Sequence, residues 1–152
     1  MAAEPVVTAH LADGQPGWRV MGEVRKSDVD TFLFLRLRFS PAVDGSQADF
    51  IVIDMDVPAG QDIGAPAYLF AVEADGGEFL APLGFALNES GHQCAWVPWD
   101  RLAPVAWNKA GDGVLDRAQL VELRVGWGGY HGRAGERLEF TVATPRLGRL
   151  GR

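Results

Sequence analysis

The 152-residue chain contains one cysteine, two tyrosines, three methionines and three histidines. The single cysteine, Cys94, excludes an internal disulfide framework and any metal site built from several thiolates. The histidines at positions 10, 92 and 131 form no HxH or HExxH pattern, so the sequence predicts no zinc centre. No apolar run approaches the roughly 18 residues that a membrane-spanning helix needs, and we expect no membrane partner.

Basic residues are outnumbered, since 14 Lys plus Arg stand against 20 Asp plus Glu and the formal net charge is −6. This balance disfavours binding to a phosphate backbone, so we expect no nucleic-acid partner. The N-terminal stretch MAAEPVVTAHLADGQPGW has no basic start followed by an apolar run, and therefore no secretory signal peptide is predicted. We expect a cytoplasmic protein if Met1 is the native start, and a secreted one if the chain is a module of a larger protein.

Catalytic motifs are also scarce. The serines lie outside any G-x-S-x-G context, and no glycine run forms a phosphate-binding loop. Cys94 lies in a strand-like run, which favours a buried, inert thiol. We therefore expect a binding or structural module rather than an enzyme.

What the sequence does contain is alternation of apolar and polar residues with period two, the pattern of half-buried β-strands. Clusters of Gly, Pro, Asp and Asn separate the alternating runs. The predicted strands are residues 6–11, 18–25, 31–40, 50–57, 68–74, 79–87, 94–97, 120–127 and 137–143. About nine short strands and little helix predict an all-β fold, a single antiparallel β-sandwich of jelly-roll type. We expect this domain to span residues 1–147, followed by a flexible C-terminal tail over residues 148–152.

The two central runs, residues 31–40 and 50–57, are expected to pair antiparallel through the connection between them. Their odd residues would then fill the core and their even residues would share the opposite face. The even positions are Phe32, Phe34, Arg36, Arg38, Phe50, Val52, Asp54 and Asp56. Aromatic rings stack on the apolar faces of sugars and charged groups hydrogen-bond to hydroxyls, so this face suits a saccharide. The alternative is that Arg and Asp form cross-strand pairs while other elements cover the Phe residues.

Five tryptophans add candidates. Trp18 and Trp127 are in phase with apolar residues and are expected in the core. Trp99 and Trp107 lie in a Pro-broken segment, where either ligand binding or plugging of an open sandwich end explains them. Tyr130, in GGYHGRAG, is expected at a turn tip that either contacts a ligand or is simply solvated. The candidate ligand-binding residues are therefore Phe32, Phe34, Arg36, Arg38, Phe50, Asp54, Asp56, Trp99, Trp107 and Tyr130.

A metal site has one candidate. Asp54, Asp56 and Asp62 lie around a glycine-containing bend, and hard cations such as calcium take several oxygen ligands. No full calcium-binding motif surrounds them. We expect no cofactor, with calcium at these three residues as the alternative.

Two stretches of the chain carry a family resemblance. The first stretch resembles carbohydrate-binding-module-like β-sandwiches of the family-nine and DOMON-like group. It consists of TFLFLRLRF, then FIVIDMDVPAGQDIG with Asp54, Asp56 and Gly60, and then YLFAVEADGGEFL. The stretch from Leu115 to the C-terminal strand is similar to the closing strands of galactose-binding-like jelly rolls. Those modules often hold a structural calcium through an acidic residue in the final strand, where this chain has Thr141 and no Asp.

The resemblance implies a non-catalytic carbohydrate-binding or accessory module that recognises a saccharide on a concave sheet face or at the Trp-rich loop. The alternative is a structural or protein-interaction β-sandwich domain without a small-molecule ligand. The expected partner is accordingly a saccharide or a neighbouring protein domain.

Overall fold

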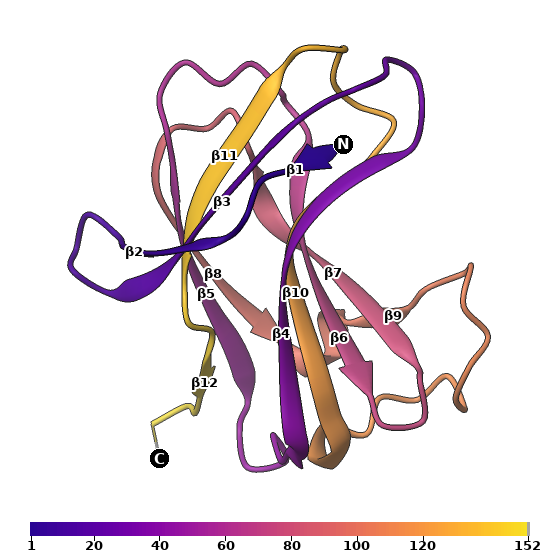
Figure 1. Ribbon diagram of the computed structural model, residues 1–152. Coiled ribbons are helices and arrows are strands. Elements are labelled where there is room, and N and C mark those ends of the chain that lie inside the picture. The colour runs from indigo at the N-terminus through magenta and orange to yellow at the C-terminus, as the bar shows by residue number, and fades with distance from the viewer. Residues whose placement is uncertain (152) are drawn as a thin grey trace.

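Two antiparallel β-sheets pack face to face in the computed structural model, which describes residues 1–151 (Figure 1). The strands are β1 (Ala2–Ala3), β2 (Val7–His10), β3 (Pro16–Glu23), β4 (Thr31–Val43), β5 (Phe50–Val57), β6 (Pro66–Glu73), β7 (Glu78–Ala86), β8 (Gly91–Pro98), β9 (Ala103–Pro104), β10 (Leu120–Gly129), β11 (Arg137–Ala143) and β12 (Arg146–Gly148). Two short 3-10 helices, η1 (Trp99–Arg101) and η2 (Arg117–Gln119), complete the described elements. No helix within residues 1–151 is long and apolar enough to cross a membrane.

We call the two layers sheet A and sheet B. Sheet A has the order β1-β3-β11-β5-β12, with β2 paired to β3 and β8 paired to β5. Sheet B has the order β4-β10-β6-β7-β9, and it forms the right-hand layer of Figure 1. Because all the pairings are antiparallel and both sheets mix strands from distant parts of the chain, the predicted jelly-roll β-sandwich is confirmed.

The core lies between the sheets and includes Leu33, Leu35, Ile51, Ile53 and Met55, which the alternation predicted, whereas Leu37 and Phe39 are only partly buried. The fully buried side chains include Ile51, Ile53, Met55, Leu69, Phe79, Trp127, Leu138 and Phe140. Trp127 is confirmed as a core residue, with none of its surface exposed, whereas Trp18 is partly buried against the core. All nine predicted strands are present. The strands that were missed, β1, β9 and β12, are two or three residues long, too short to show a period.

The predicted pairing of the two central strands is wrong. β4 pairs with β10 in sheet B, and β5 pairs with β8, β11 and β12 in sheet A. The connecting residues 44–49 therefore cross from one layer to the other. In a jelly roll the strands that follow each other in the chain often belong to opposite sheets, which the general preference for short hairpins does not anticipate.

The C-terminal residues remain attached to sheet A beyond the expected domain end at residue 147. Gly148 pairs with Phe50 in the ladder between β12 and β5. The Leu150 N–H donates a hydrogen bond to Asp49 Oδ2 at 2.8 Å. Of the expected tail over residues 148–152, Arg152 lies outside the described residues. The domain boundary itself stays a prediction.

Candidate functional site

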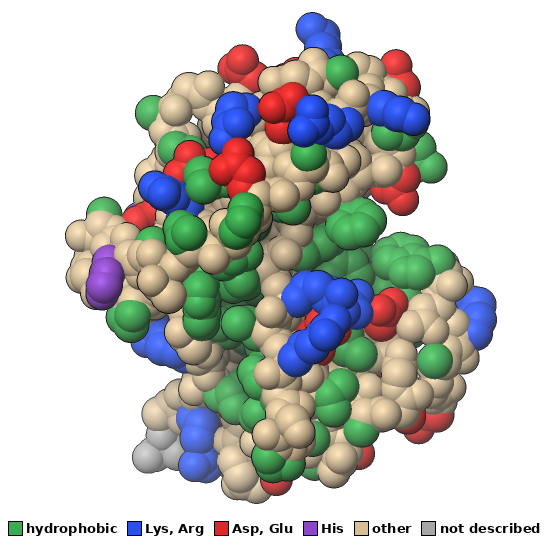
Figure 2. All heavy atoms as spheres, in the orientation of Figure 1, with side chains coloured by type: hydrophobic (Ala, Val, Ile, Leu, Met, Phe, Trp, Pro, Cys, Tyr) green, Lys and Arg blue, Asp and Glu red, His purple; other side chains and the backbone are tan. Residues whose placement is uncertain are grey.

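A cleft of about 720 Å³ lies on the outer face of sheet B. Its walls come from β4, β6, β7, β10 and the loop that follows β9. The lining residues are Asp30, Phe32, Phe34, Arg36, Tyr68, Phe70, Leu80, Trp107, Arg124, Gly128, Gly129 and Tyr130. In the orientation of Figure 2, basic side chains gather in the middle of this surface, next to hydrophobic ones. The cleft therefore combines apolar walls with a few convergent polar groups, the usual form of a small-molecule site.

The cleft is hollow because its central strand carries glycines. β10 lies between β4 and β6 and places Gly126 and Gly128 on the outer face, in phase with Arg124. A Cβ atom at position 126 would collide with the carbonyl oxygen of Leu33, so only glycine allows β4 and β10 to approach this closely. A Cβ atom at position 128 would lie 3.5 Å from the Phe34 ring. Because positions 126 and 128 carry no side chain, the aromatic rings on the neighbouring strands form the walls of the cleft.

Four aromatic side chains form a row across the cleft. The ring centroids of Phe32 and Phe34 are 6.2 Å apart, and Phe34 meets Phe70 edge to face at 5.1 Å. Trp107, on the loop after β9, lies 6.2 Å from Phe70. Phe32 is 65% exposed and Trp107 68% exposed, so the two ends of the row present most of their surface to solvent. Exposed rings that pack against less exposed ones are well suited to stacking against a ligand.

The polar part of the cleft is an arginine network centred on Glu122, which is 5% exposed. Arg36 Nε donates to Glu122 Oε1 at 2.7 Å, and Arg124 Nη2 donates to Oε2 at 2.9 Å. Arg124 also donates from Nη1 to Glu78 Oε1 at 2.9 Å. Burial raises the pKa of Glu122, but hydrogen bonds from Arg36 and Arg124 outweigh it and hold the pKa below its usual value. The carboxylate stays ionised and fixes the two guanidinium groups in the cleft.

The structure brings five of the sequence-predicted ligand residues together in this cleft: Phe32, Phe34, Arg36, Trp107 and Tyr130. Arg38 lies beside them, with its Nε 3.5 Å from Glu122 Oε1. The predicted single face, however, is divided between the two sheets, since Phe50, Asp54 and Asp56 lie on β5 in sheet A. These three cannot share a ligand with the cleft.

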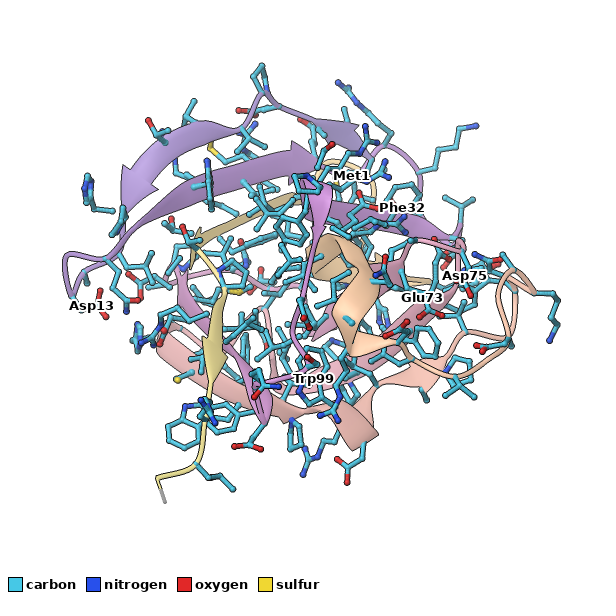
Figure 3. The ribbon with its side chains drawn as sticks, turned by 90° about the horizontal axis from the view of Figure 1, so that it is seen from below. Met1, Asp13, Phe32, Glu73, Asp75 and Trp99 are labelled. Atoms are coloured by element: carbon cyan, nitrogen blue, oxygen red, sulfur yellow. The ribbon has the colours of Figure 1, made fainter. Side chains whose placement is uncertain are left out.

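Trp99 is the other predicted ligand residue that lies away from the cleft. Its side chain is only 9% exposed and its Nε1 donates to the carbonyl of Ala48 at 2.8 Å. It thereby anchors the connection that crosses between the sheets. Of the two roles considered for Trp99, this corresponds to closing an open end of the sandwich rather than to binding a ligand (Figure 3).

On the outer face of sheet A, the predicted Asp54 and Asp56 bind other side chains. Asp54 accepts a hydrogen bond from Arg146 at 2.9 Å, and the His92 ring lies between the two carboxylates, 2.8 Å from Asp56 and 3.1 Å from Asp54. The hydrogen bond to Asp56 raises the pKa of His92, burial opposes this, and Asp54 adds to the rise. Cys94, on the same face, is exposed, so its predicted burial is wrong.

The predicted metal ligands do not come together. Within residues 1–151, Asp54, Asp56 and Asp62 do not bring one oxygen atom each to within 4.8 Å of one another. Strand geometry places Asp54 and Asp56 two residues apart on one face, where His92 lies between them, and Asp62 belongs to the loop after β5. A different acidic group, Glu73 with Asp75 and Asp112, does satisfy this distance.

Sequence reasoning missed seven residues of the cleft: Asp30, Tyr68, Phe70, Leu80, Arg124, Gly128 and Gly129. Arg124 alternates with the buried Leu123 and Val125 of β10, whereas Tyr68 and Phe70 stand in an almost wholly apolar run of β6 that shows no alternation. The alternation orients Arg124 outward. Nothing in the sequence shows that β4, β10 and β6 are neighbours.

No family model and no curated protein sequence matches the chain. Solved structures do share its fold. The family 11 carbohydrate-binding module of the cellulosomal cellulase Lic26A-Cel5E from Clostridium thermocellum is 14% identical, with a TM-score of 0.64 over 99% of this chain and 84% of that chain. The family 11 module in complex with a β-1,3-1,4-mixed-linked tetrasaccharide gives a TM-score of 0.67 at 14% identity, over 100% of this chain and 87% of that chain.

An exo-β-agarase contains a similar domain within a much longer chain. It is 14% identical, with a TM-score of 0.60 over 100% of this chain but only 23% of the agarase. The chain therefore has the β-sandwich fold of carbohydrate-binding modules, as the sequence resemblance implied. The modules among these structural neighbours belong to family 11 rather than to the family-nine or DOMON-like group.

Proposed function

We propose that this protein is a non-catalytic carbohydrate-binding module whose saccharide lies in the cleft on the outer face of sheet B. The observation that carries the proposal is the row of aromatic rings from Phe32 to Trp107 beside the fixed guanidinium groups of Arg36 and Arg124. The likeness to a family 11 module in complex with a mixed-linkage tetrasaccharide supports the ligand class.

The geometry of the cleft suits a chain of sugar rings. Phe32 and Trp107, both mostly exposed, would stack on the apolar faces of pyranose units at opposite ends of the row. A guanidinium carries five N–H donors, and Arg36 uses two of its nitrogen atoms on Glu122. Its side chain is 48% exposed, so remaining donors are available for sugar hydroxyls.

The carboxylates beneath the cleft favour binding over catalysis. A glycosidase needs a carboxylic acid whose pKa is raised so that it can protonate the leaving oxygen. The pKa of Glu122 is instead held below its usual value, and Glu78 is paired with Arg124 at 2.9 Å. Both carboxylates therefore act as supports for the arginines.

The test is affinity gel electrophoresis and titration calorimetry with β-1,3-1,4-glucan, followed by a panel of polysaccharides that includes agarose. The chain offers a matched pair of variants, since Trp107 is 68% exposed in the cleft and Trp96 is 63% exposed on sheet A. We expect Trp107→Ala to weaken binding by about tenfold or more, equivalent to about 1.4 kcal/mol, while Trp96→Ala binds as the wild type does. No retention on any polysaccharide, or equal retention of the two variants, would overturn the proposal.

A second candidate function is a protein-interaction domain. Trp96 stacks flat on Phe50, with ring centroids 4.9 Å apart, and the exposed side chains of Leu147 and Leu150 belong to the segment that follows β11. Exposed apolar patches with charged neighbours mark protein interfaces. If the chain binds no polysaccharide, this surface of sheet A becomes the first place to search for a partner domain.

A further inference from the structure

A buried carboxylate with one unpaired oxygen atom lies at the end of β6 in sheet B. Glu73, the last residue of β6, is 2% exposed. Its Oε2 accepts a hydrogen bond from the Asp116 N–H at 2.7 Å, whereas its Oε1 has no hydrogen-bond partner within the described part of the chain. A buried, unpaired carboxylate oxygen is costly, so its surroundings call for an explanation.

Two further carboxylates lie close to that of Glu73. Asp75 lies in the turn between β6 and β7, next to Glu73 in Figure 3, and Asp112 lies in the loop between β9 and β10. One oxygen from each of the three carboxylates lies within 4.8 Å of the others. No Lys or Arg within residues 1–151 forms an ion pair with any of them. Three acidic groups converge here without a basic partner.

The backbone keeps this space open. A Cβ atom at Gly77 would lie 2.7 Å from Glu73 Oε1, and one at Gly111 would lie 2.8 Å from both Asp75 oxygens. Burial raises the pKa of Glu73, and the nearby charges of Asp75 and Asp112 raise it further, although the Asp116 N–H opposes them. The cluster is thus repulsive when all three groups are ionised and no cation is bound.

We propose that Glu73, Asp75 and Asp112 form a calcium site that joins the turn between β6 and β7 to the loop 105–116. Calcium takes six to eight oxygen ligands in flexible geometry, and the carboxylates supply up to six, with water or backbone carbonyls completing the shell. Magnesium requires a stricter octahedron and fits a cluster of this kind less well. This position also differs from the final strand that the sequence resemblance would suggest for a structural calcium.

The site is linked to the cleft through the loop that it would hold. Trp107 lies in loop 105–116, and its neighbour Asn108 donates from Nδ2 to the carbonyl of Gly76 at 3.1 Å. Calcium between Asp75 and Asp112 would add a second tie between the same loop and the same turn. We therefore expect calcium to restrain Trp107 against Phe70, a consequence that rests on the proposed function.

The metal site is tested without any saccharide. The chain is stripped with a chelator, and its Tm and calorimetric heats are measured with calcium or magnesium at millimolar concentration. We expect calcium to raise the Tm by several degrees and magnesium to raise it less, because a ligand that binds the folded state stabilises it. Asp112→Asn retains an oxygen for the Val114 N–H, which Asp112 Oδ1 now accepts at 2.9 Å, but it should weaken calcium binding by about tenfold or more.

The control variant is Asp44→Asn. Asp44 is also exposed and accepts the Ser46 N–H at 2.9 Å in the same kind of turn, but it lies outside the cluster. It should respond to calcium as the wild type does. Wild-type protein that shows no calcium-dependent Tm or heat, or equal calcium responses of the two variants, would overturn the site. In that case Glu73 and Asp75 share a proton instead.

The link to the cleft is tested separately, by polysaccharide retention with calcium and with chelator. Weaker retention after chelation, and in Asp112→Asn at all calcium concentrations tested, supports it. Calcium binding with unchanged retention overturns the link and leaves the metal site standing. Absence of retention in every condition counts against the proposed function, and the Tm measurement still decides the metal site.

Discussion

Glu122 offers the sharpest test of the cleft's construction, because one buried carboxylate holds the arginines in place. In the variant Glu122→Gln the shape of the side chain is kept and the charge is lost. Removing one partner of a buried ion pair costs about 3–5 kcal/mol. The Arg36 side chain is 48% exposed, so water can solvate its charge when the carboxylate is removed. The Arg124 side chain is only 21% exposed, so most of the loss in stability comes from its interaction with Glu122. We therefore expect the free energy of unfolding to fall by about 2 kcal/mol at pH 7.

Urea unfolding followed by tryptophan fluorescence measures this loss, as a lower midpoint with an unchanged m-value. For a domain of this size it corresponds to a Tm lower by roughly 4–8 °C. Because the pKa of Glu122 is depressed in the folded state, its contribution is present above its ordinary pKa of 4.5 and is lost as the pH falls through the folded value. The gap between variant and wild type should therefore narrow below about pH 4.5.

The control is Glu89→Gln, which changes an exposed residue of the same type. A Glu122→Gln protein within about 0.5 kcal/mol of the wild type at pH 7 would refute the reasoning, since that is the range of an ordinary surface substitution. It would mean that the arginines hold their positions without the carboxylate.

Two further predictions concern single contacts. The pKa of His92 should lie above 6.5 in an NMR titration and return toward 6.5 in the variant Asp56→Asn. The stabilisation of the fold by protonated His92 is present at lower pH and should be lost as the pH rises through the pKa of His92 in the folded state. An unchanged titration of His92 in the variant would contradict this prediction. Gly126→Ala should lower the free energy of unfolding by about 3 kcal/mol, because the added Cβ atom collides with the carbonyl of Leu33. Gly128→Ala should fold as the wild type does and only narrow the cleft. Comparable Tm values for the two variants would show that β4 and β10 can separate without a loss of stability.

The fold class followed from local patterns. Alternation in runs such as residues 31–40 depends only on which residues face the core, and a strand buried on one face shows it wherever its partners lie. The same pattern correctly oriented Phe32, Phe34 and Arg36 outward and Trp127 inward. For this reason half of the candidate ligand residues lie in the cleft.

The pairing of the strands could not be predicted from this alternation. The backbone hydrogen bonds that join β4 to β10 are available to any strand, and residues 44–119, half of the chain, separate the two segments. Without that pairing, Tyr68, Phe70 and Arg124 are simply outward residues on unrelated strands. The prediction that β4 and β5 share one ligand-binding face was wrong for the same reason, since the jelly roll places these consecutive strands in different sheets.

The sequence by itself thus determined the β-sandwich, the inward and outward faces of alternating strands such as β4 and β10, and the lack of a catalytic motif. Only the tertiary structure decided which outward faces are neighbours, because this depends on contacts between residues far apart in the chain. It placed Trp107 beside Phe70, and it brought Asp112 to Glu73 and Asp75 from a distant loop. Both the proposed saccharide cleft and the proposed calcium site arise from such long-range contacts.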